Sequence, residues 1–155
     1  MNKWDKRFME MASVIASWAS CYQAGRKIGA VIVKDKRIMT TGYNGAPAGV
    51  KTCVERGECL RKKLGIQSGT HHEICYAVHA EQNAIIQAAR LGISIAGATL
   101  YCTHQPCVLC AKMIVNAGIS RVVYREGYPD EFSVEMLREG GVELEKYEEA
   151  EPDGQ

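Results

Sequence analysis

The stretch ATLYCTHQPCVLCAKMIVNAG, residues 98–118, contains a strand, a short loop and a helix in direct succession. Its first part is a short apolar run that predicts a strand over residues 98–103. Pro106 suits the first position of a helix and Gly118 suits the position after its end, so we expect a helix over residues 107–117. A strand that leads directly into a helix is typical of α/β proteins.

Two further elements precede this stretch. Residues 77–91 are predicted to form a helix that ends at Gly92. Residues 28–33 and 38–43 are short apolar runs on either side of a charged turn, residues 34–37, which predicts a β-hairpin.

The N-terminal region has apolar residues at spacings of four and three. They are Trp4, Phe8, Met11, Ile15 and Trp18. This spacing predicts an amphipathic helix ending near Gly25, with the apolar stripe in the core.

The C-terminal region continues the alternation of strands and helices. We expect a strand over residues 121–124, a helix over 132–139 and a last strand over 142–147. The alternating second half requires right-handed crossovers and parallel pairing, whereas the hairpin is antiparallel. We therefore expect one domain, residues 1–147, with a partly parallel sheet covered by helices on both faces, and a frayed acidic tail, residues 148–155.

Composition excludes several classes of protein. The chain has 155 residues, enough for one domain, and 46% of them are hydrophobic, which excludes a disordered chain. Its net charge of +1 argues against a strongly basic nucleic-acid-binding protein. The longest uncharged stretch, residues 91–111, is interrupted by glycine, proline and polar residues, and it predicts no membrane span. The N-terminus lacks the apolar core of a signal peptide, so we expect a cytoplasmic protein.

Seven cysteines call for an explanation. Disulfides are disfavoured in a reducing compartment, and an odd number cannot pair completely. Metal binding is the leading hypothesis.

Four residues at the starts of two expected helices point to a metal site. Cys107 and Cys110 are three positions apart, so they share a helix face and can bind one ion. His79 and Glu81 are two positions apart, so both reach one centre only if that centre lies off the first turn of their helix. Starts of helices are common sites in α/β folds.

These residue types predict a catalytic zinc. Two thiolates and one imidazole, from Cys107, Cys110 and His79, leave the fourth tetrahedral position for water. Glu81 is not needed as a ligand and could carry a proton to a leaving group. The pattern H-x-E…P-C-x-x-C is the signature of zinc-dependent nucleobase deaminases. The alternatives are a redox pair for the two cysteines and a first-turn acid, favoured by the helix dipole, for Glu81.

Three motifs resemble the cytidine/deoxycytidylate deaminase family: GYNGAPAG (residues 42–49), HAEQNAI (79–85) and PCVLC (106–110). The likeness extends over about residues 4–147. It implies a three-layer α/β/α sandwich around a five-stranded mixed sheet, with zinc on the histidine and two cysteines named above. It also implies hydrolysis of dCMP to dUMP and ammonia, which supplies dUMP for thymidylate synthesis. The first two motifs are narrower and point to the nucleotide branch of the family.

The resemblance also implies substrate contacts. Asn44 matches a position that hydrogen-bonds the sugar, and the backbone N–H of Ala80 matches one that holds the pyrimidine O2. Tyr128 falls where relatives place an aromatic residue near the nucleotide, and Arg26 falls where a cation could meet phosphate. From the residues alone, the same Asn44 could simply be a turn residue, Tyr128 a packing residue and Arg26 a solvated charge.

A second group of metal-ligating residues lies in a long region without periodicity. Its members are Cys53, Cys59, His71, His72 and Cys75. Three thiolates and one histidine would complete a structural zinc site. The resemblance favours His72 over His71 as the histidine, while Thr52 stands where some relatives have one. The alternative is ordinary reduced cysteines that pack as small hydrophobes. We expect Cys21 and Cys102 in the core.

Other functions stay open at this stage. A deaminase of another base, such as cytosine, guanine or tRNA adenosine, would use the same zinc chemistry, although a tRNA enzyme should have a basic, aromatic surface. A zinc-bearing competence or DNA-uptake protein could keep the fold without catalysis. The resemblance further implies a homo-oligomer, with a hexamer as one form, and a response to dCTP and dTTP.

Overall fold

The computed structural model describes residues 1–23, 26–127 and 130–149. Its elements, in chain order, are α1 (Lys3–Ala16), β1 (Gly29–Lys34), β2 (Arg37–Tyr43), α2 (Cys53–Arg56), α3 (Leu60–Lys63), α4 (Ala80–Leu91), β3 (Thr99–His104), α5 (Val108–Asn116), β4 (Arg121–Glu126), α6 (Glu131–Glu139) and β5 (Glu143–Lys146). Every expected strand is present, whereas α2 and α3 were not predicted. No helix among the described residues has the length and hydropathy needed to span a bilayer.

The five strands form one mixed sheet in the order β2-β1-β3-β4-β5. β1 pairs antiparallel with both β2 and β3, while β3, β4 and β5 are parallel. The hairpin turn has positive φ at both Asp35 and Lys36, which is the geometry of a two-residue turn that matches the twist of the strands. The mixed sheet expected from the sequence is confirmed.

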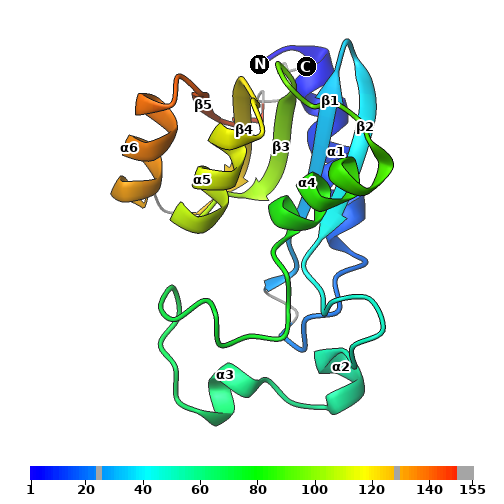
Figure 1. The fold of residues 1–155 in the computed structure, drawn as a ribbon, viewed down its shortest axis with the longest axis vertical. Helices are drawn as coiled ribbons and strands as arrows, with labels where there is room; N and C mark the ends of the chain where they lie inside the picture. Colours follow the sequence, from blue (N-terminus) through cyan, green and yellow to red (C-terminus); the bar gives the residue numbers. More distant parts are fainter. Residues whose placement is uncertain (24–25, 128–129, 150–155) are drawn as a thin grey trace, which may run out of the picture.

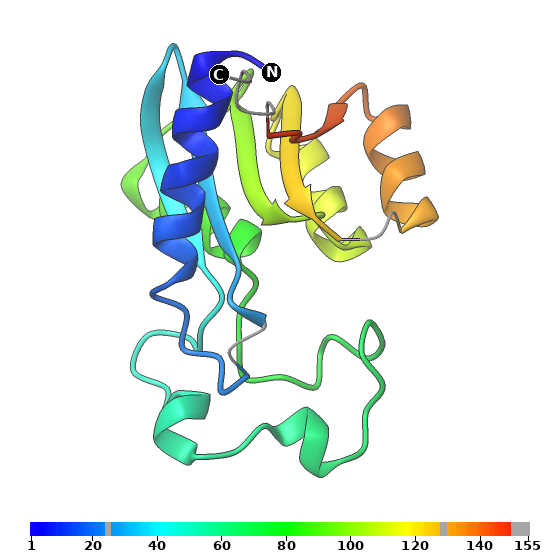
Figure 2. The same ribbon diagram turned by 180° about the vertical axis from the view of Figure 1, so that it is seen from behind.

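Helices cover both faces of this sheet, as Figures 1 and 2 show from opposite sides. Strand residues alternate between the two faces, with Ile32 in the cluster beneath α4, α5 and α6 and Val31 in the cluster beneath α1. The two layers of helices and the central sheet make the three-layer α/β/α sandwich that the resemblance implied.

The prediction for the first helix was wrong at its C-terminal end. α1 ends at Ala16 rather than near Gly25, and Ser17 caps it with its hydroxyl on the carbonyl of Val14. Phe8 and Ile15 are buried as expected. Trp18, expected in the core, is 60% exposed because it lies beyond the end of the helix. Met11 is 39% exposed because it lies outside the helix face that carries the buried Phe8, Ala12 and Ile15.

A buried ion pair joins α1 to the sheet. Asp5 accepts hydrogen bonds of 2.8 Å from both the Arg121 guanidinium and the Tyr101 hydroxyl. Burial raises the pKa of Asp5, but the bonds from Arg121, the backbone N–H of Asn2 and Tyr101 outweigh it, so the net pKa is lowered. Asp5 therefore stays ionised beside Arg121.

Gly42 allows α4 to pack closely on the hairpin. A Cβ atom at Gly42 would lie 2.1 Å from the carbonyl oxygen of Ala80 and 2.5 Å from the backbone nitrogen of Ala84. Neither backbone atom can move without shifting the helix. The first glycine of the GYNGAPAG motif thus sets the position of the start of α4.

Residues 46–78, which we call the arm, extend from one end of the sandwich and carry α2 and α3 (Figure 1). Both helices have four residues. The Arg56 guanidinium lies 3.8 Å from the centre of the Tyr76 ring, which ties α2 to the returning chain. The N-terminus lies at the opposite end of the molecule (Figure 1). Of the predicted frayed tail, residues 150–155 lie outside the described residues.

Candidate active site

The predicted ligands of the catalytic zinc lie together at the starts of α4 and α5. His79 directly precedes α4, and Cys107 directly precedes α5, at the C-terminal end of β3. The His79 Nδ1 atom lies 3.5 Å from Cys107 Sγ and 3.3 Å from Cys110 Sγ. The three ligand atoms all lie within 4.8 Å of one another, and they form the one such group among the residues described. A borderline-soft ion with nitrogen and sulfur ligands, such as zinc, fits this set.

The side chains of this group differ in pKa, so they hold their protons with different strength. The hydrogen bond from the Cys110 thiol lowers the pKa of Cys107 to about 3, and the bond to His79 adds to this effect, against the opposing effect of burial. The same contact with Cys107, together with burial, raises the pKa of Cys110. The hydrogen bond with Cys107 also raises the pKa of His79. One thiolate is therefore already present, and a metal ion would displace the remaining proton.

Glu81 lies beside the ligands and is 4% exposed. Its Oε2 atom accepts a hydrogen bond of 3.5 Å from the Cys110 thiol. Burial raises the pKa of Glu81, so this carboxyl group can hold a proton more readily than an exposed glutamate. Burial, and then the nearness of Glu81, raise the pKa of Cys102, which is fully buried as predicted. Glu81 thus lies at the metal group without belonging to it.

Two predicted substrate contacts lie at the same end of the sheet. Ala80 is the first residue of α4, so its N–H is one of the donors that a helix leaves without an internal partner. Asn44 is 8% exposed, and its side chain accepts from the N–H of Ile28 at 2.7 Å and donates to the carbonyl of Arg26 at 2.6 Å. The Asn44 amide thus joins the end of β2 to the residues before β1.

The other two predicted contacts are placed differently. Arg26 is half-buried. Burial acts to raise the pKa of Cys59, but hydrogen bonds to its sulfur and, to a smaller extent, the charge of Arg26 lower it, so Arg26 lies within electrostatic range of the arm. The prediction for Tyr128 falls outside the described residues.

The arm contains a second cluster of thiols. Burial raises the pKa of Cys53, and the thiols of Cys75, Cys21 and Cys59 raise it further, which requires that they lie near it. Gln23, two residues after Cys21, donates a hydrogen bond of 3.3 Å to Cys59 Sγ. This cluster is looser than the His79 group, because its sulfur atoms are not all within 4.8 Å.

The structure thus changes the membership of the second cluster. Cys21 was expected in the core, but it is half-buried and lies with Cys53. His72, the predicted fourth ligand, lies against His79, with 5.5 Å between ring centres and 80° between ring planes. Cys21 and Cys53 are 32 residues apart, so no local spacing in the sequence connects them. The one sequence signal was that Cys21 lies outside the predicted strands and has no other assigned role.

This combination of fold and site defines a class of protein. A histidine and a glutamate at the start of one helix, facing two cysteines at the start of the next, form the site of zinc-dependent nucleobase deaminases. The model of the cytidine and deoxycytidylate deaminase zinc-binding region matches residues 2–126. The chain belongs to the cytidine and deoxycytidylate deaminase family.

Individual relatives carry more specific names. The chain is 39% identical to the deoxycytidylate deaminase of Schizosaccharomyces pombe over 93% of its own length, but it spans only 44% of that protein. It is 42% identical to the deoxycytidylate deaminase of Mycobacterium phage D29, over 78% of this chain and 93% of the phage protein. The dCMP deaminase of cyanophage S-TIM5, solved in complex with dCMP and dUMP, superposes with a TM-score of 0.71 and 32% identity, over 95% of this chain and 99% of the phage chain.

Proposed function

We propose that this protein is a zinc-dependent deaminase that converts dCMP and water into dUMP and ammonia, and so supplies dUMP for thymidylate synthesis. The observation that carries the proposal is the convergence of Glu81 with His79, Cys107 and Cys110 at one end of the sheet. A structural zinc needs no acid outside its ligands, whereas deamination needs a group that moves protons. Relatives of similar length to this chain, named for this reaction, support dCMP as the substrate.

Each residue of the site has a separate role in the proposed reaction. His79, Cys107 and Cys110 would hold the zinc, which lowers the pKa of a bound water toward 7. Glu81 takes a proton from the water that attacks C4 and delivers it to N3 of the cytosine ring. It then takes the second proton of that water, from the new C4 hydroxyl, and passes it to the amine as the C4–N bond breaks and ammonia leaves. The N–H of Ala80 donates to the pyrimidine O2, and Asn44 bonds the sugar. Arg26 and Tyr128 are proposed to contact the phosphate and the nucleotide.

The test is a comparison of four substrates. Purified protein is incubated with dCMP, CMP, deoxycytidine and cytosine, and the ammonia released is measured. We expect the highest kcat/KM for dCMP and a poor rate with deoxycytidine, because a 5′-phosphate allows a charge-assisted contact. Equal efficiency on dCMP and deoxycytidine would refute the phosphate requirement. Release of ammonia from cytosine alone, or only from guanine or tRNA adenosine assayed in parallel, would favour another base. Absence of activity with zinc bound would favour a non-catalytic competence or DNA-uptake protein.

A second, structural zinc in the arm is part of the proposal. Cys53, Cys59 and Cys75 are the predicted thiolate ligands, and the nearness of Cys21 to Cys53 supports a fourth thiolate in place of His72. Four cysteines form a closed structural site. Binding would draw these sulfur atoms together, and the free energy of binding would order the arm. Metal analysis of protein that has never met a chelator should find two zinc ions per chain, and one per chain would refute the second site.

Self-association and location complete the proposal. A groove between β2 and α4 is bordered by the exposed apolar side chains of Tyr43, Ile86 and Leu91, which supports a homo-oligomer. The hexamer as one form is proposed from the family resemblance alone. Light scattering in solution tests this.

Regulation by dCTP and dTTP is proposed from the family resemblance, and it predicts a change in KM for dCMP when either nucleotide is added. None of the seven cysteines, all of them among the described residues, forms a disulfide, which supports a cytoplasmic location.

A further inference from the structure

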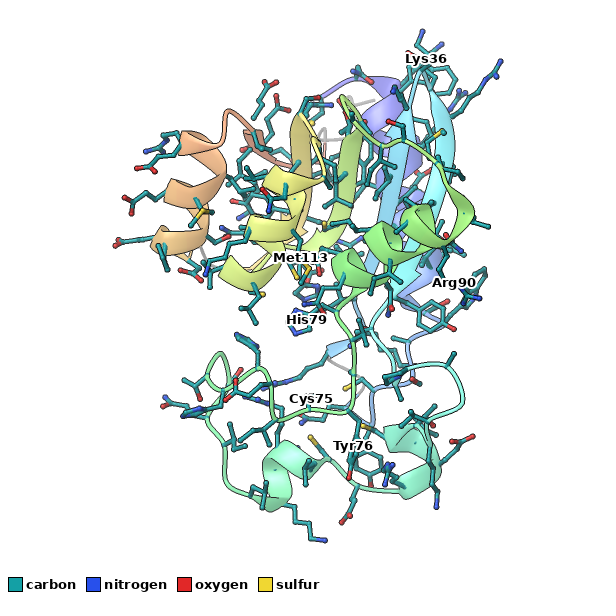
Figure 3. All side chains as sticks on the ribbon, viewed as in Figure 1. Lys36, Cys75, Tyr76, His79, Arg90 and Met113 are labelled. Atoms are coloured by element: carbon teal, nitrogen blue, oxygen red, sulfur yellow. The ribbon has the colours of Figure 1, made fainter. Side chains whose placement is uncertain are left out.

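His72 belongs to the arm but lies against a residue of the active site. Its ring is 5.5 Å from the ring of His79, edge to face, and it is partly buried there. Figure 3 shows His79 on the side of the sandwich that faces the arm. His72 is not a member of the group that could hold the catalytic metal among the residues described. Its position therefore calls for a different explanation.

The loop that carries His72 is built around one buried cation. Arg61 is 7% exposed, and its guanidinium donates hydrogen bonds to the carbonyls of four residues. They are Gln67 (3.1 Å), Thr70, His71 (2.5 Å) and Ile74 (3.4 Å). A buried arginine normally pairs with a carboxylate, but among the described residues none lies within salt-bridge distance of Arg61. The guanidinium instead closes residues 67–74 into one compact turn.

The backbone next to His72 is strained. His71 has φ of +46°, in the left-handed region that residues with a Cβ atom rarely adopt. Such a conformation is unfavourable for a residue with a Cβ atom and persists only where the surroundings enforce it. The His71 side chain gains little from it, because the ring is exposed and its contact is with the exposed Glu73, at 3.3 Å. The strain instead sets the direction in which the next residue, His72, leaves the turn.

We propose that His72 contacts the pyrimidine base of the substrate and forms one wall of the nucleotide pocket. The inference rests on the proposed deamination of dCMP. The reacting carbon must lie beside Glu81 and the His79 group, so a ring packed on His79 lies at the base end of the substrate. An imidazole ring offers a flat surface against which a base can pack. The contact is one of shape and aromatic surface, so it depends on the ring and not on its charge.

The experiment compares three variants of His72 with a matched control. His72→Ala and His72→Gln remove the aromatic surface, whereas His72→Phe keeps it. His71→Asn changes the neighbouring imidazole and keeps a residue that tolerates positive φ. For each holoenzyme, kcat and KM for dCMP, zinc content and the Kd of dUMP by calorimetry are measured.

We expect KM for dCMP and Kd for dUMP to rise about tenfold in both the alanine and glutamine variants, with zinc content unchanged. Both constants should return to within about threefold of the parent values in His72→Phe. His71→Asn should match the parent protein. The glutamine variant, which is close to histidine in size, serves if the alanine variant does not fold.

Three results would overturn the proposal. Unchanged KM and Kd in His72→Ala or His72→Gln would show that the ring does not meet the base. Loss of zinc in these variants would show that His72 supports His79 structurally, and failure of His72→Phe to restore binding would show that the imidazole nitrogens matter. If the parent protein binds zinc but neither binds dUMP nor deaminates dCMP, the proposed function itself fails.

Discussion

The active site and the arm both gather thiols, but different forces hold them in place. Cys107, Cys110 and His79 stand at the starts of helices that pack on the sheet, and Cys110 is fully buried. The thiols around Cys53 are positioned by a chain with two helices of four residues each, which are too short to be stable alone. The sandwich can therefore preform its metal site, whereas the arm depends on Arg61 and, in our proposal, on a second zinc.

The largest expected effect is a loss of activity without a loss of zinc, when the carboxylate of Glu81 is replaced. Glu81→Gln should lower kcat by about 10²–10⁴-fold, because it removes the group that moves protons. Zinc content should stay that of the parent, since Glu81 is not in the ligand group. Ammonia release and metal analysis on the same preparation measure both. Activity near that of the parent would show that another residue carries the protons.

The next effect tests the dependence of the arm on metal. Cys59→Ser should reduce zinc from two ions per chain to one and lower the Tm by roughly 5–10 °C, because binding free energy at a structural site acts as folding free energy. The zinc of the His79 group should stay bound. Ser68→Ala, an exposed change in the same arm, is the control. A parent stoichiometry of one zinc, with Cys59→Ser equally stable, would mean that reduced cysteines merely pack in the arm.

A third prediction tests whether the sandwich places the active site through backbone packing. Gly42→Ala should lower the free energy of unfolding by about 1–3 kcal/mol, because the new methyl group would meet the backbone of Ala80 and Ala84. Since Ala80 follows His79 directly, kcat for dCMP should fall as well. The exposed change Ala48→Ser, nearby in sequence, should alter neither quantity. Urea unfolding and steady-state kinetics decide the matter, and a stable, fully active Gly42→Ala would contradict this account of α4.

The smallest effect concerns the pH dependence of the sandwich. The pKa of Asp5 is lowered in the folded state, so its contribution to stability is present above the unfolded pKa, about 3.8, and is lost as pH falls through the folded pKa. Asp5→Asn should therefore flatten the loss of stability at and below about pH 4. Urea midpoints measured from pH 2 to 7 test this. Asp35→Asn, in the exposed hairpin turn, should retain the slope of the parent, and a variant at Asp5 with that same slope would refute the role of the ion pair.

Much of the sandwich could be predicted from local pattern. The strand at β3 and the charged hairpin turn agree with the structure. The helix α5 lies between Pro106 and Gly118 as expected, but it begins at Val108, so Pro106 is not its first residue. The residues of the metal group were also predictable, because each stands at a fixed offset from the start of a helix. The end of α1 was not predictable, because the apolar spacing continues to Trp18 while the helix stops at Ala16.

The arm resisted prediction for a physical reason. Its order comes from contacts between residues far apart in the chain, such as the Gln23 amide on Cys59 and the Arg61 guanidinium on the Thr70 carbonyl. Such contacts leave no periodic trace in the sequence. The local pattern therefore grouped His72 with the cysteines, whereas Arg61 directs the loop so that His72 meets His79.

The amino-acid sequence by itself determined the α/β class, the succession of helices and strands along the chain and the chemistry of the His79, Glu81, Cys107 and Cys110 group. These features follow from short spacings along helices and strands. Only the tertiary structure decided that Cys21 lies within electrostatic range of Cys53 and that the arm presents His72 to the active site. Both outcomes depend on how a buried arginine and a few long-range hydrogen bonds fold an irregular chain. Short spacings in the sequence thus identify the residues of the active site, and long-range packing determines which residues of the arm lie next to it.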